Sequence, residues 1–177
     1  MNFRRIMDKY DAAELARNNE DKHDYFVDVA DARYIVRRAF RIVEEQAKAG
    51  GIDPLAHQAL IQIYGSKTME LPVNHVADRL DISPAFASSV VKSLVKLGYV
   101  TRRRDDKDQR VTFVSATETG IKLLIDIDKS VRFHVDYFTR QLNLSERENA
   151  LSIMLFYVGL PSKGDEHAVM AATSGDR

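Results

Sequence analysis

The chain has 177 residues, a length that favours one domain or one domain with an added oligomerisation region. Its 26 Lys plus Arg balance 26 Asp plus Glu, so the net charge says little about partners, because binding responds to local charge. The absence of cysteine excludes disulfides, thiolate nucleophiles and cysteine-based redox sensing. No apolar run suits a signal peptide or a membrane span, so we expect a soluble cytoplasmic protein.

The first half of the chain is expected to be helical. Residues 1–23 are polar, and we expect an extension that is either frayed or a short helix packed on another element. From Asp24 apolar residues recur at helical spacing up to Gly50, which predicts a helix of about 25 residues. Asp53 followed by Pro54 is typical of an N-cap and a first helical position, and the helix that they begin should end at Gly65.

The middle of the chain changes its period from helix to strand. Residues 70–72 can form no more than an edge strand, and residues 73–80 predict a short helix. Ser83 and Pro84 begin the next helix, and Gly98 ends it. Residues 99–104 and 111–115 suit two strands, joined by the charged tip 105–110 into a hairpin.

Two further helices follow the hairpin. Thr117 is expected to cap a helix of about 25 residues that carries apolar residues at helical spacing. Ser145 and Glu148 have capping-box spacing and are expected to begin a last helix, which Pro161 ends. Residues 161–177 are small and polar, and we expect a disordered tail.

Positive charge is concentrated in one part of this pattern. The interval from Ser83 to Arg104 holds five basic residues and no Asp or Glu. Two short helices followed by a hairpin make a winged helix-turn-helix, whose second helix lies in the major groove of DNA. Acidic residues would be repelled by phosphates there, whereas each Lys or Arg can displace a condensed counterion. The predicted fold is therefore mainly α with a small β-hairpin.

The segment from Val73 to Gly120 resembles the MarR/SlyA family of bacterial transcription regulators. The residues that carry the resemblance are the basic strand Arg102-Arg103-Arg104, the tip Asp108-Gln109-Arg110, the strand 111–115 and the helix start Thr117-Glu118-Thr119-Gly120. The resemblance implies that Asp108 orients the basic wing residues and that Arg110 enters the minor groove, where it would read groove shape. Two apart on an extended tip, Asp108 and Arg110 can point to the same side. A solvated charged turn is the alternative.

The residues expected to contact DNA lie on the second helix, the basic strand and the tip. They are Ser83, Ala85, Phe86, Ser88, Ser89, Lys92, Arg102, Arg103, Arg104, Lys107, Asp108 and Arg110. Many relatives carry arginine where this chain has Ser89, and that absence weakens a guanine contact of about 1–3 kcal/mol. Lys92 stands where an acid is common and can act as a phosphate contact. Phe86 is either buried or touches a thymine methyl group.

Apolar surface near both ends of the chain indicates a homodimer, with packing inside one chain as the alternative. The aromatic residues that such a dimer would bury are Tyr25, Phe26, Phe133, Phe138, Phe156 and Tyr157. A symmetric dimer would read a palindromic operator in double-stranded DNA. The expected division is an extension at 1–23, dimerisation helices at 24–50 and 117–160, a DNA-binding lobe at 53–115 and the tail at 161–177.

The family resemblance also implies a repressor that is released by a small aromatic or anionic ligand, such as an aromatic acid or its CoA thioester. The candidate ligand contacts are Tyr34, Arg38, His57 and Tyr64. An arginine among aromatic residues can hold a carboxylate in a bidentate pair. Arg38 can equally belong to a solvated face, and His57 can be a surface residue in the second turn of its helix.

Other functions find little support in the sequence. The five histidines show no metal spacing, so a zinc site would need the fold to gather them with acidic residues. No catalytic or nucleotide-binding motif is present, and we expect neither an enzyme nor a bound cofactor. The alternative to a DNA-binding regulator is a winged-helix protein-interaction module without specific DNA binding.

Overall fold

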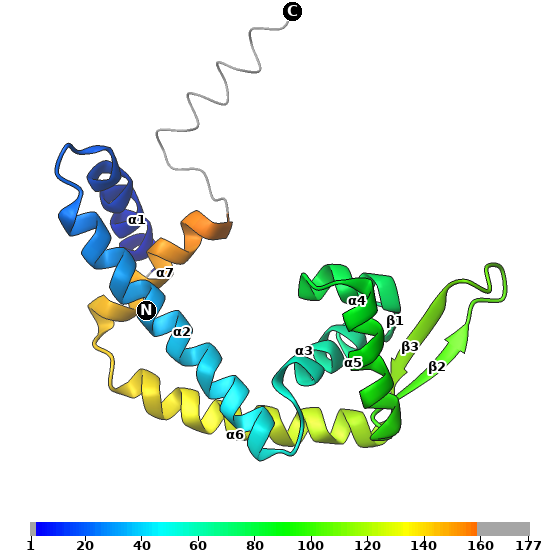
Figure 1. Cartoon of the computed structure of the whole chain (residues 1–177). Helices are drawn as coiled ribbons and strands as arrows, with labels where there is room; N and C mark the ends of the chain where they lie inside the picture. Colours follow the sequence, from blue (N-terminus) through cyan, green and yellow to red (C-terminus); the bar gives the residue numbers. More distant parts are fainter. Residues whose placement is uncertain (1–2, 159–177) are drawn as a thin grey trace, which may run out of the picture. The chain divides into compact units, whose positions relative to one another are not determined.

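The structure is a computed structural model that describes residues 3–158, so the tail expected at 161–177 lies outside it. Its elements in chain order are α1 (Phe3–Asn18), α2 (His23–Ala49), α3 (Pro54–Tyr64), β1 (Glu70–Pro72), α4 (Val73–Leu80), α5 (Pro84–Lys96), β2 (Val100–Arg104), β3 (Thr112–Ala116), α6 (Glu118–Arg140) and α7 (Leu144–Val158) (Figure 1). The prediction of a mainly helical protein with a small antiparallel sheet is confirmed. None of the described helices has the length and apolar character to cross a bilayer.

Among the described residues, one compact unit is formed by 3–40 together with 135–158. In its described part α1 packs against α7, and Ile6 and Tyr10 of α1 are buried. A cluster of Ala13, Val29, Ala32, Ala150 and Ile153 joins α1, α2 and α7. Of the two possibilities for the first residues, the structure therefore contains the packed helix.

The beginning of α7 differs from the prediction. The backbone N–H of Asn143 donates to Glu146 Oε2 over 2.7 Å, and the N–H of Glu146 donates to Asn143 Oδ1 over 2.9 Å. The capping box is thus Asn143 with Glu146, and the expected pair of Ser145 and Glu148 is wrong. Both pairs have the same spacing, so the sequence pattern alone does not distinguish them. Glu148 is instead fully buried, 3.3 Å from Arg5 of α1.

The second compact unit comprises residues 41–134. Its core is formed by α3, α4, α5 and the sheet, and its fully buried large side chains include Leu60, Ile63, Val76, Leu94 and Val114. The predicted helix starts are confirmed, since Asp53 accepts from the N–H groups of Leu55 and Ala56 and Ser83 from that of Phe86. Gly98 has a φ of 75°, a left-handed conformation that glycine adopts without strain at the end of a helix.

The sheet has the order β1-β3-β2 and is antiparallel throughout, so β1 is an edge strand as predicted. The tip of the hairpin is not extended. Residues 105–111 form a turn in which the N–H of Asp105 donates to Val111 O and the N–H of Val111 donates to Asp108 O. The expectation of an extended tip is therefore wrong, because these bonds curl the backbone between Asp108 and Arg110.

Thr117 and Gly120 fasten the base of the wing to α6. Thr117 Oγ1 donates to Gly98 O over 2.7 Å and accepts from the N–H of Gly120 over 3.1 Å, as an N-cap does. A Cβ atom at position 120 would overlap the carbonyl oxygen of Tyr99. The Thr-x-x-Gly pattern thus has a steric reason here: glycine lets the first turn of α6 approach the backbone that leads into β2.

Candidate nucleic-acid interface

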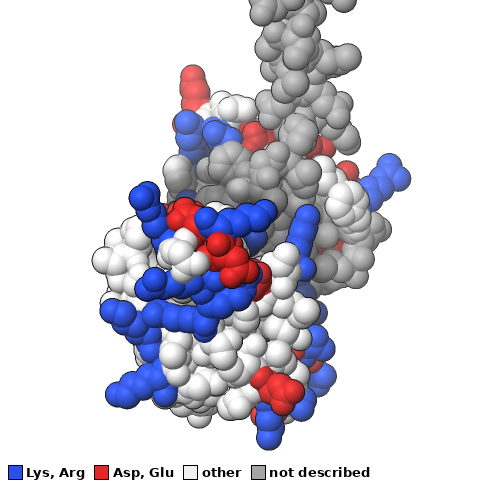
Figure 2. All heavy atoms as spheres, turned by 90° about the vertical axis from the view of Figure 1, so that its right-hand side faces the viewer, with Lys and Arg blue, Asp and Glu red and all other residues white. Residues whose placement is uncertain are grey.

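A groove runs between α5 and the wing. Its lining residues are Val73, Asn74, Pro84, Ser88, Lys92, Arg102, Arg110, Val111 and Thr112. Three of them are cationic, and none of these lining residues is acidic. Figure 2, viewed from the wing side, shows Lys and Arg gathering on this face around a smaller group of Asp and Glu. The arrangement suits a polyanion.

Helix α5 is positioned by its apolar face. Ala87, Val90, Val91 and Leu94 are buried in the core, which leaves the opposite face of the helix to solvent. Phe86 lies on that open face with 52% of its surface exposed, so of its two possible environments the structure has the exposed one. Ser89 is also exposed, and its hydroxyl donates to Ala85 O over 3.2 Å.

Strand β2 separates its three arginines. Arg102 pairs with Val114 and Arg103 with Phe113, and directly opposed residues lie on the same face of a sheet. Because Val114 is buried in the core, Arg102 lies on the helix side, where its Nη2 donates to Ser88 O over 3.4 Å. Arg103 lies on the outer face and pairs with Glu70. The structure therefore brings Arg102 to the groove but not Arg103.

The tip is ordered by its own carboxylates. Asp108 accepts from the backbone N–H of Arg110 over 3.0 Å, and Asp105 accepts from that of Lys107 over 3.2 Å. Asp108 thus fixes the main chain that carries Arg110, and Arg110 lines the groove. Lys107 and Arg104 are exposed and are not among the groove residues.

The predicted ligand contacts fall into two groups. His57 and Tyr64 line one cavity of about 470 Å³ with apolar residues of α3 and α6, whereas Tyr34 and Arg38 are not among its lining residues. The alternative of His57 as a surface residue is wrong, because only 4% of it is exposed. Burial lowers the pKa of His57 by desolvating its charged form, and its Nδ1 has no hydrogen-bond partner in the described structure.

Sequence reasoning missed several residues of this region. Asn74 and Thr112 line the groove, and Glu70 holds Arg103. The alternation of side chains along a strand was a usable signal, since it places Arg103 opposite to Arg102 and Arg104. No group of three His, Asp or Glu residues able to hold a metal occurs in the part of the chain that the structure describes.

The groove, the helix pair and the three-stranded sheet define a winged helix-turn-helix protein. Residues 50–111 match a model described as MarR family. The HTH-type transcriptional regulator MhqR of Bacillus subtilis is 27% identical over 133 residues, which cover 73% of this chain and 90% of MhqR. A MarR transcriptional regulator from Methanosarcina mazei is 25% identical, with a TM-score of 0.57 and coverage of 75% of this chain and 94% of that one.

Structures of relatives with DNA share the fold. A mutant of E. coli MarR complexed with operator DNA has a TM-score of 0.59 at 18% identity, covering 72% of this chain and 90% of that one. The S. aureus MepR–DNA complex has a TM-score of 0.59 at 19% identity, covering 78% and 98%. Residues 50–111 of this chain are thus similar to the MarR family of winged helix-turn-helix transcription regulators, and the described fold is the one found in these complexes with DNA.

Proposed function

We propose that the groove between α5 and the wing is the surface with which this regulator binds its operator. The observation that carries the proposal is the convergence of Lys92, Arg102 and Arg110 on a groove whose lining residues include no acid. Three cations from two separate elements face one concave surface in a chain of zero net charge. Such a local excess attracts phosphates whatever the overall balance.

Each element has its own part in this binding. The first turns of α5 enter the major groove and present Ala85, Phe86 and Ser89 to base edges, where the exposed Phe86 meets a thymine methyl group. Lys92 and Arg102 contact phosphates that border the groove. Arg110 reaches the minor groove from the tip that Asp108 orders.

The protein acts as a homodimer on a palindromic operator, with contacts from helices within 24–50 and 117–160. The support is a set of large aromatic side chains that one chain leaves in solvent: Phe26 (60% exposed), Tyr34 (62%), Phe133 (70%), Tyr137 (67%) and Tyr157 (50%). Exposed aromatic surface of this extent is typical of an interface. Sedimentation should give twice the chain mass of 20.1 kDa, and a monomer at micromolar concentration would contradict the dimer.

A small molecule that binds in the His57 cavity releases the repressor. The cavity is lined mainly by apolar residues, and its lining contains Asp128 and no Lys or Arg. Asp128 already accepts from Arg132 Nε over 3.0 Å, so this lining offers no free cation to a carboxylic acid, and the ligand is an uncharged aromatic molecule rather than an anionic one. His57 Nδ1 and the Tyr64 hydroxyl are available to orient its polar groups.

The DNA proposal is tested by selecting duplexes from a random pool with the wild-type protein. Affinity for the selected duplex and for a scrambled duplex is then measured for the wild type and for Arg110→Ala. We expect a clear preference for the selected duplex, and a loss of affinity in the variant. Selection that enriches no sequence would instead favour the protein-interaction module.

The effector proposal is tested by thermal unfolding with uncharged phenols and with aromatic carboxylates. A ligand well above its dissociation constant raises the melting temperature. We expect stabilisation by the uncharged compounds, abolished in His57→Leu, together with release of the selected duplex. Stabilisation by carboxylates alone would reject the uncharged class.

A further inference from the structure

We propose that Arg103 is a positioning residue of the wing, held by Glu70 on the face turned away from the groove, and that this pair aims Arg102 and Arg110 at DNA. The inference rests on the proposed function of the groove. Under this proposal Arg103 does not make the DNA contact that the sequence suggested but holds the wing in position.

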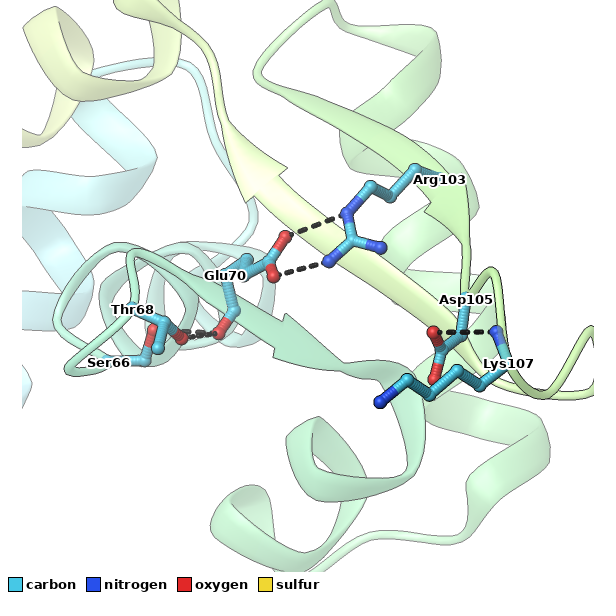
Figure 3. Close-up of polar contacts among 6 residues, drawn as sticks. All are labelled: Ser66, Thr68, Glu70, Arg103, Asp105 and Lys107. Atoms are coloured by element: carbon cyan, nitrogen blue, oxygen red, sulfur yellow. Dashed lines mark hydrogen bonds and ion pairs between the residues drawn. The ribbon is translucent and has the colours of Figure 1, made fainter.

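The Glu70–Arg103 pair joins the two outer strands of the sheet across its central strand. Arg103 Nε donates to Glu70 Oε2 over 3.1 Å and Nη2 to Oε1 over 2.5 Å, which makes the pair bidentate. Figure 3 shows Arg103 of β2 and Glu70 of β1 pointing toward one another. The guanidinium also lies over the ring of Phe113 on β3, 4.5 Å from its centre. Three strands are thereby held through one side chain.

The charges around Arg103 favour the position of its guanidinium beside Glu70. The hydrogen bond with Glu70 raises the pKa of Arg103 above its ordinary value, and the charges of Glu70, Asp106 and Asp105 add to the effect. A phosphate contact through Nε or Nη2 would have to replace the bonds of these two nitrogens to Glu70. Arg102 has no such competing carboxylate among its described contacts, and it lines the groove.

The backbone of Glu70 is held by the turn that precedes it. The main-chain carbonyl oxygen of Glu70 accepts from Ser66 Oγ over 2.9 Å and from Thr68 Oγ1 over 3.0 Å. Ser66 Oγ also lies 3.0 Å from Ile63 O of α3, and Met69 has a left-handed φ of 56°, uncommon for a residue other than glycine. The pair therefore connects the wing to a tight turn that follows α3.

The position of Arg103 fixes the position of its neighbours. Side chains alternate along a strand, so a twist or shift of β2 that moves Arg103 also moves Arg102 on the other face. Arg110 follows, because the tip that carries it is continuous with β2 and β3. Loss of the pair is expected to weaken specific binding without removing a contact to DNA.

The experiment compares Glu70→Gln, Glu70→Arg, Arg103→Glu and the double variant Glu70→Arg with Arg103→Glu, using the selected and scrambled duplexes. We expect Glu70→Gln to weaken binding to the selected duplex by about three- to tenfold, as for other contacting pairs, with its salt dependence unchanged. Glu70→Arg should also weaken binding although it adds positive charge. The charge-reversed double variant should recover affinity to within about threefold of wild type.

A matched control separates positioning from contact. Arg102→Glu should not be rescued by Glu70→Arg, because Arg102 lies on the other face. The Glu70–Arg103 pair is partly exposed, so the melting temperatures of the variants should stay close to that of wild type.

Two results would overturn the inference. If Arg103 contacts phosphate, Glu70→Gln frees it and binding stays equal or tightens, and Arg103→Glu remains weak when Glu70→Arg is added. Either outcome with a wild type that prefers the selected duplex rejects the inference alone. A wild type without any preference for the selected duplex rejects the proposed function and the inference with it.

Discussion

The salt dependence of operator binding gives a direct measure of the groove. Each protomer contributes three groove cations, Lys92, Arg102 and Arg110, so a dimer contributes six. With a slope of ~0.9 for each phosphate charge neutralised, and with Arg110 in the minor groove counted like the two phosphate contacts, log affinity against log salt should have a slope of about −5. Affinity should then fall about 10³-fold between 50 and 200 mM salt. Fluorescence anisotropy with the selected duplex at four or more salt concentrations measures the slope.

The change in slope caused by a single substitution measures the contribution of that cation. Arg102→Ala removes two contacts from the dimer and should reduce the magnitude of the slope by about 1.8. Arg103→Ala in the same assay should leave the slope unchanged, since that guanidinium is held by Glu70. A slope near zero for the wild type would refute the reasoning that the groove binds phosphates. Equal slope changes for both variants would show that the two arginines are not separated by the faces of β2.

Three further predictions concern stability, measured by urea unfolding. Gly120→Ala should lower the free energy of unfolding by about 2–3 kcal/mol, because its methyl group would overlap the carbonyl of Tyr99. The folded-state pKa of His57 lies below its usual 6.5, so the unfolded state binds the proton more readily. The free energy of unfolding should thus fall as the pH drops below about 6.5, by at most ~1.4 kcal/mol per pH unit from this group, and His57→Leu should remove this component. Arg5→Ala should cost about 1–2 kcal/mol, since it leaves the buried Glu148 without its cation, and Glu148→Gln should recover part of that loss.

Each of these has a result that contradicts it. A Gly120→Ala protein as stable as wild type would mean that α6 does not need its close approach to Tyr99. An identical pH dependence with and without His57 would place the titrating group elsewhere. If Arg5→Ala and the double variant with Glu148→Gln were equally unstable, the lost stability would come from the packing of the arginine stem and not from its charge.

The elements of the winged helix were predictable because their boundaries are local. Asp53 with Pro54 and Ser83 with Pro84 mark helix starts by chemistry that acts within four residues. Gly98 marks an end because it alone among nearby residues adopts a left-handed conformation without strain. The change from helical to alternating periodicity after Gly98 then locates the wing.

The features that the sequence did not give depend on contacts between distant segments. His57 has the spacing of either a buried or an exposed residue, and the packing of α6 beside α3 decides between them. Glu148 was assigned to a cap, but α1 supplies a partner 143 positions away (148 − 5). The three arginines read as one basic stretch until the register with β3 divides them between two faces. Periodicity identifies the faces of an element but does not say what lies against each face.

Helix α6 lines one proposed binding surface of the unit at 41–134, the His57 cavity, and its first turn is connected to the base of the wing that borders the other. Its first turn is fastened to the base of the wing through Thr117, whose hydroxyl bonds Gly98 O and the Gly120 N–H. One to three turns later, Leu124, Ile127 and Asp128 form a wall of the His57 cavity. Since a helix is rigid over this length, a molecule that displaces α6 from α3 would also displace the residues that lead into β2. Ligand binding in the His57 cavity would therefore be transmitted to Arg102 through α6 and the two hydrogen bonds of Thr117, all inside one compact unit.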